Sequence, residues 1–195
     1  YPVRAYEPSD VKFDLETDFN FLVLAQGSAI RKNMNNTIKW FVEEFHDNEN
    51  VGLIVKTFIA ANSVIDRHYS YNNLKEYLDR KFDGRKCKVY LLHGEMTDEE
   101  LSALYQYKKV KALVSLTHGE GFGLPLFEAS YYGLPVICPD WSGQCDFLYA
   151  PTKNKKTGKQ TLKPHFASVD YDLQPIQKEA EWAGVLHPGS MWCYP

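Results

Sequence analysis

The sequence predicts an α/β protein with a doubly wound, mostly parallel, Rossmann-like sheet and helices on both faces. Short apolar runs alternate with helix-period segments at least five times along the chain. These runs lack the polar–apolar alternation of a half-exposed strand, which indicates strands that are covered on both faces. With 195 residues and 44% hydrophobic residues, the chain can bury the core of one such domain.

Five strands are expected, at residues 19–25, 51–57, 88–93, 112–117 and 135–139. Helices are expected between them: one over apolar positions 38–45, one over positions 74–82 after a connection of about a dozen residues, and one that begins at the capping box of Thr97 and Glu100. Because crossovers between parallel strands are right-handed, the C-terminal ends of the strands meet at one edge, where ligands bind.

The two ends of the chain carry weaker patterns. Residues 1–18 contain two prolines, several charges and no clear period, which is typical of a linker or lead-in segment before a domain at residues 19–195. Residues 151–165 contain five lysines and no acidic residue, which predicts an exposed hairpin. It could meet an anionic acceptor or a membrane surface, although a charge run is more often only solvated. An edge strand is expected at 165–171 and a short helix at 175–183.

Composition narrows the range of functions. The formal net charge of -3 argues against a nucleic-acid partner. No apolar run approaches the roughly 18 residues that span a bilayer, and no signal peptide opens the chain, so a cytoplasmic protein is expected. The four cysteines show no paired metal-ligand spacing, and no metal site is predicted.

The most informative stretch runs from Ala112 to Asp140 and reads as strand, glycine-rich turn, helix, turn and strand. Seven residues separate Glu120 from Glu128 across this turn. Pro125 suits the first turn of a helix, because its missing N–H would have no partner there. The free N–H groups and the positive dipole end of such a helix attract phosphate, and the glycines let a ligand approach the backbone.

The segment GEGFGLPLFEASYYGLPVICPD resembles the paired-glutamate signature of retaining GT-B-fold glycosyltransferases, the group-one family. The resemblance is strongest over residues 19–148, which are similar to the C-terminal, donor-binding domain of these enzymes. The alternative is an ordinary Rossmann-like crossover in which Glu120 is a solvated loop residue and Glu128 a carboxylate at the start of a helix.

The resemblance implies the roles of the site residues. Lys32, in the run IRKN, would contact the donor diphosphate, Glu120 would hold the donor sugar, and Glu128 would bind the ribose hydroxyls. Lys32 and Glu120 are therefore the candidate catalytic residues. The family often has Gly-Arg after the first strand, where this chain has Ala25-Gln26. The candidate donor-binding residues are Arg31, Gly121, Phe122, Gly123, Leu124, Glu128, Gly94, Met96 and His118.

Four of these candidates also have a purely structural alternative. The loop of Gly94 and Met96 borders the nucleotide base in the family, and Met96 offers apolar contact to a ring, but a plain loop before a capped helix fits equally well. His118 could bond a phosphate or sugar oxygen, although a lone histidine is more often structural. Arg31 could be either a second phosphate contact or a solvated surface group.

The resemblance implies the donor-binding half of an enzyme that transfers a hexosyl group from a nucleotide-diphosphate sugar without an obligatory metal or other cofactor. Its acceptor site would lie on an N-terminal domain, on the full-length or on a separate chain. One alternative is a non-enzymatic nucleotide or nucleotide-sugar binding module. A weaker one is a related two-domain enzyme, such as a sugar-nucleotide epimerase or a phosphorylase.

Overall fold

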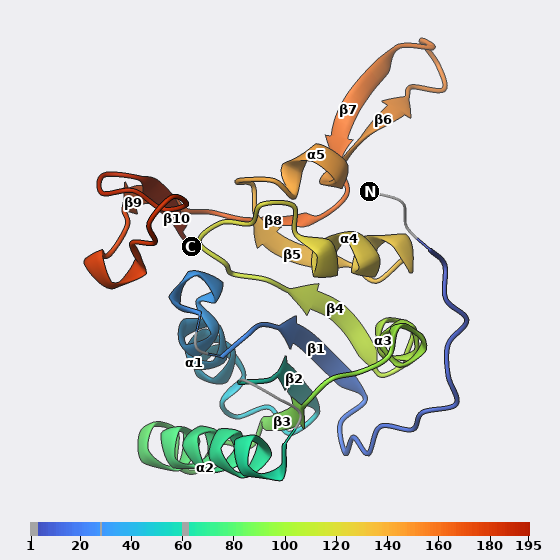
Figure 1. Cartoon of the computed structure of the whole chain (residues 1–195). Helices are drawn as coiled ribbons and strands as arrows, with labels where there is room; N and C mark the ends of the chain where they lie inside the picture. The colour runs from blue at the N-terminus through green and yellow to red at the C-terminus, as the bar shows by residue number, and fades with distance from the viewer. Residues whose placement is uncertain (1–3, 28, 60–62) are drawn as a thin grey trace.

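Six parallel strands form the centre of the structure, a computed structural model that describes residues 4–27, 29–59 and 63–195 (Figure 1). The strand order is β3–β2–β1–β4–β5–β8, so β1 and β4 lie at the centre of the sheet and the other strands add on either side of them. This topology confirms the predicted fold class. The strands are β1 Phe19–Leu24, β2 Val51–Thr57, β3 Lys88–His93, β4 Val110–Val114, β5 Val136–Pro139 and β8 Ala167–Val169.

Helices cover both faces of the sheet (Figure 1). One face packs against α1, Met34–Phe45, and α2, Val64–Lys81. The other packs against α3, Asp98–Tyr105, α4, Leu124–Tyr131, and the short α5, Cys145–Leu148. Among the described residues, no helix is both long and apolar enough to cross a membrane.

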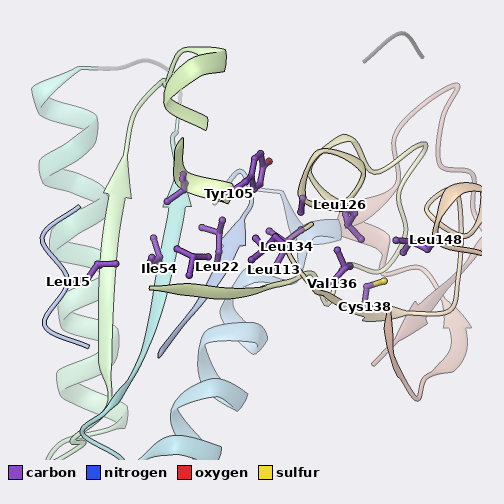
Figure 2. Close-up of a cluster of buried hydrophobic side chains, with 13 residues drawn as sticks. Leu15, Leu22, Ile54, Tyr105, Leu113, Leu126, Leu134, Val136, Cys138 and Leu148 are labelled. Carbon is purple, nitrogen blue, oxygen red and sulfur yellow. The ribbon is translucent and has the colours of Figure 1, made fainter. Parts of the chain in front are cut away.

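Strand alternation divides the core into two clusters of buried side chains. On β1, Leu22 belongs to the cluster under α3, α4 and α5, whereas its neighbour Val23 belongs to the cluster under α1 and α2. On β2, Ile54 and Val55 divide in the same way. Figure 2 shows the first cluster, where Tyr105 of α3 lies close to the sheet residues Leu22 and Ile54. Apolar side chains on both faces explain why the strands read as unbroken apolar runs.

Several element predictions were wrong in extent. Helix α2 begins at Val64, within residues 58–70, which were expected to form a connection, and its N-cap Ser63 accepts a hydrogen bond from Asp66 N at 3.1 Å. The N-terminal turns of α2 carry exposed Val64 and Ile65, so they lack the one-sided pattern by which the helix was expected. In the segment predicted as a short helix, only a single 3₁₀ turn forms, η2, Lys178–Ala180.

The terminal segments pack against the sheet and its helices. Within residues 4–18, the Tyr6 carbonyl accepts a hydrogen bond from Ser102 Oγ at 2.7 Å, and Ser9 N donates to the Glu99 carbonyl at 3.1 Å, which fastens this segment to α3. A domain boundary at residue 18 stays a proposal. The predicted lysine-rich hairpin is confirmed: β6, Tyr149–Lys153, pairs with β7, Gln160–Pro164, and projects from the body (Figure 1). A second hairpin joins β9, Asp172–Pro175, to β10, Met191–Tyr194.

Candidate functional site

Two loops meet at the C-terminal edge of the sheet. The connection after β1 contains the 3₁₀ turn η1, Ile30–Lys32, and it packs on the loop between β4 and α4. The Arg31 carbonyl accepts hydrogen bonds from His118 N at 2.9 Å and from Thr117 Oγ1 at 3.0 Å. Asn33 Nδ2 donates to the Leu116 carbonyl at 2.9 Å. These bonds place the Arg31 and Lys32 side chains beside the glycine-rich turn.

The Glu120 side chain lies between these two cations. Lys32 Nζ donates to Oε1 at 2.7 Å, and Arg31 Nη1 lies 3.0 Å from Oε2. Arg31 also donates to the Gly119 carbonyl. Glu120 is only 8% exposed, so these charge-assisted bonds act with little competition from water. The structure thus brings together both candidate catalytic residues and Arg31.

A third loop, after β5, braces the glycine-rich turn. Ser142 Oγ donates to the Glu120 carbonyl at 2.6 Å, and Gly143 N donates to the same oxygen at 3.0 Å. A Cβ atom at Gly143 would lie 2.1 Å from the Gly121 carbonyl oxygen, so only glycine fits this position. Neither residue was predicted from the sequence. The available signal was the run Trp141-Ser142-Gly143, which follows the fifth predicted strand after one residue.

The N-terminus of α4 opens toward the site. Gly123, with φ +86°, is the N-cap, Leu124 is the first helical residue, and Pro125 follows it. The first turn has N–H groups without intrahelical partners and the positive end of the helix dipole. A Cβ atom at Gly121 would meet nothing within 4 Å, so a ligand can approach its backbone. The Phe122 ring instead packs 5.1 Å from the Phe147 ring, between centroids, and anchors the turn.

Glu128 lies on α4 but beyond its first turn, because the helix begins at Leu124. Tyr105 Oη donates a hydrogen bond to Glu128 Oε2 at 2.9 Å. Burial raises the pKa of the Glu128 carboxyl, the bond from Tyr105 opposes this, and the charge of Asp98 adds to it. The contact between Glu128 and ribose stays a prediction.

A groove of about 470 Å³ runs along this edge of the sheet. Lys32 and Pro125 line it together with Met96, and Lys56 of β2 contributes a further charge. Gly94, with φ +110°, donates its N–H to the Thr57 carbonyl at 3.0 Å and thereby shapes the loop of Met96. A cavity of about 520 Å³ between α1 and α2 has a mostly apolar lining and none of the paired charges. The groove is therefore the better candidate site.

His118 is buried beneath the C-terminal strand. It is 3% exposed, its Nδ1 lies 2.6 Å from the Cys193 carbonyl oxygen, and its ring stacks on Trp192 with centroids 4.6 Å apart. Burial lowers the pKa of His118, while the bond to Cys193 opposes that shift. A carbonyl can only accept, so Nδ1 carries the proton. In this structure His118 is a packing residue, and its contact with a donor stays a prediction.

Residues 70–158 match the family described as glycosyl transferases group 1. This stretch, just under half of the chain, is similar to a glycosyl transferase group 1 domain. The matched residues include Glu120, Glu128 and the glycine-rich turn between them. The family predicted from the sequence is therefore confirmed. A search of curated proteins finds no match to this chain.

Solved structures share the fold of this chain. The OtsA apo structure matches with a TM-score of 0.51 and 11% identity over 69% of this chain and 32% of its own. The E. coli trehalose-6-phosphate structure bound with UDP-2-fluoro glucose matches with a TM-score of 0.50 and 11% identity over 67% of this chain and 31% of its own. The GtfA/B complex matches with a TM-score of 0.50 and 15% identity over 89% of this chain and 29% of its own. The chain spans about a third of the length of these structures.

Proposed function

We propose that this chain is the C-terminal, donor-binding half of a retaining glycosyltransferase that moves a hexosyl group from a nucleotide-diphosphate sugar to an acceptor. The observation that carries this proposal is Glu120, held between Arg31 and Lys32 beside the N-terminus of α4. Glu120 holds the donor sugar, and Glu128 binds the ribose hydroxyls. An N-terminal acceptor domain, on the same or on a separate chain, forms the opposite wall of the crevice.

The chemical difficulty of the transfer is negative charge that develops on the departing diphosphate. Preorganised donors stabilise such charge most effectively where little water competes. Lys32 and Arg31 supply two cations on one side, and the first turn of α4 supplies N–H groups and a dipole on the other. In the free chain Glu120 holds both cations in place, so little reorganisation is needed when the diphosphate arrives. These groups act without an obligatory metal.

The uridine diphosphate hexose in one structure of the same fold supports a donor of this class. The decisive test begins with calorimetric titration of UDP, GDP and UDP-glucose. We expect dissociation constants between roughly 10 µM and a few millimolar, unchanged by EDTA, because an open groove screens each contact. Glu120→Gln should weaken UDP-glucose more than UDP, since the carboxylate contacts the sugar. Failure to bind any of these nucleotides would refute the proposal.

Turnover separates a transferase from a binding module. Residues 1–195 by themselves should transfer no sugar and hydrolyse the donor slowly at most. A separately expressed N-terminal domain should tighten donor binding and restore transfer, because closure over the donor excludes water. Donor that is bound but never turned over, with that domain present, would favour the binding module.

A further inference from the structure

Among the residues that the structure describes, the buried cation of Lys56 has one hydrogen-bond acceptor. Lys56 is the penultimate residue of the strand β2, is 8% exposed, and donates from Nζ to the Gly94 carbonyl. Burial lowers the pKa of the Lys56 ammonium and the charges of Glu95 and Glu100 oppose this shift, but in the described part of the chain no carboxylate forms an ion pair with it. An ammonium group has three N–H donors, so two of them have no acceptor among the described residues. Buried charges normally have partners, which indicates that a ligand supplies the missing oxygen.

The position of Lys56 shows which part of a ligand it would meet. Lys56 pairs in register with Leu24 of β1, and both side chains line the groove. Lys32 and Pro125 line the same groove beside the anion-binding end of α4. The Nζ group of Lys56, however, is bound to the carbonyl that starts the loop of Met96. The ammonium therefore lies at the end of the groove where apolar Met96 can cover a flat ring.

Resting on the proposed function, we infer that Lys56 donates a hydrogen bond to a carbonyl oxygen of the donor nucleobase and makes the site prefer uracil or guanine over adenine. Uracil and guanine carry a carbonyl oxygen where adenine carries an amino group. Lysine can only donate, so an amino group facing it would leave that N–H of the buried ammonium without an acceptor. A site built to hydrogen-bond one group discriminates strongly against an analogue that lacks it.

The test compares UDP, GDP and ADP by calorimetry in the wild-type protein and in Lys56→Met. The wild type should bind UDP or GDP about tenfold or more tighter than ADP, as expected for one charge-assisted hydrogen bond. In Lys56→Met the affinities for UDP or GDP and for ADP should differ by no more than about twofold, because binding of UDP or GDP weakens while the affinity for ADP is unchanged. Lys39→Met, which makes the same substitution at an exposed lysine of α1 outside the groove, is the matched control and should leave the wild-type ratio of affinities unchanged.

Each other outcome points to a different failure. An equal loss for all three nucleotides in Lys56→Met would overturn the inference, since it would place Lys56 on the diphosphate or make it a support of the Gly94 loop. ADP bound by the wild type as tightly as UDP and GDP would overturn it without any variant, even if Lys56→Met did not fold. If the wild type bound none of the three, the proposed function itself would fail.

Discussion

Lys32 Nζ lies 2.7 Å from Glu120 Oε1, although the two residues are 88 positions apart in the chain. The pair joins the loop after β1 to the loop after β4, two adjacent strands of the sheet. It also keeps an anion between two cations at the point where the proposed diphosphate must bind. A donor diphosphate bound there would have to share Lys32 with Glu120, which would link recognition of the phosphate to the position of the carboxylate that we propose holds the sugar.

The Lys32 charge should be selective for phosphate. Lys32→Ala is expected to lower the affinity for UDP about tenfold to a hundredfold, because the substitution removes a charge directed at an anion. The affinity for uridine, which has no phosphate, should change little. Calorimetric titration of both ligands measures the difference. Equal losses for UDP and uridine would mean that Lys32 acts through the shape of the groove.

Glu128→Gln should separate stability from binding. Folding raises the pKa of Glu128, so the folded chain binds this proton more tightly than the unfolded chain, and the ionised group costs stability above that raised pKa. The glutamine keeps an acceptor for Tyr105, so the thermal midpoint near neutral pH should rise by a few degrees.

The same substitution should weaken UDP about tenfold and leave 2′,3′-dideoxy-UDP unaffected, because only the first ligand has ribose hydroxyls for the carboxylate. If both ligands lost affinity to the same extent, Glu128 would not contact the ribose.

Two glycines of the site should respond differently to alanine. Gly143→Ala places a methyl group against the Gly121 carbonyl, and overpacking of this kind costs about 1–3 kcal/mol, so both the thermal midpoint and UDP affinity should fall. Gly121→Ala meets open space, so the midpoint should hold while UDP affinity falls. Unfolding curves and titrations of both variants measure this contrast. Normal UDP binding by Gly121→Ala would show that the donor does not approach this backbone.

A fall in pH should destabilise the packing of the C-terminal strand β10 on His118. Because folding lowers the pKa of His118 from its ordinary value of 6.5, the neutral ring contributes stability that is complete above that value and is lost as the pH falls through the lowered pKa. His118→Asn retains a donor for the Cys193 carbonyl but does not titrate. Thermal midpoints measured from about pH 8 to about pH 5 should therefore fall more steeply in the wild type. Parallel curves would exclude His118 as the titrating group.

Local patterns in the sequence predicted most of the sheet. The second and third strands have the expected bounds, because unbroken apolar runs indicate strands covered on both faces. The capping box of Thr97 forms as expected, since it depends on residues three positions apart. The start of α2 was missed because its first turns have exposed apolar residues and no buried stripe.

The sequence by itself determined the α/β class, the glycine-rich turn before α4 and the two glutamates on either side of it, because each depends on neighbours along the chain. Only the tertiary structure decided that Arg31 and Lys32 form ion pairs with Glu120 and that Ser142 and Gly143 donate hydrogen bonds to its carbonyl. The tertiary structure also decided that β10 buries His118. It also decided that Lys56 lines the groove. These contacts join residues from different strands, and strand order and register, which bring them together, are properties of the assembled sheet.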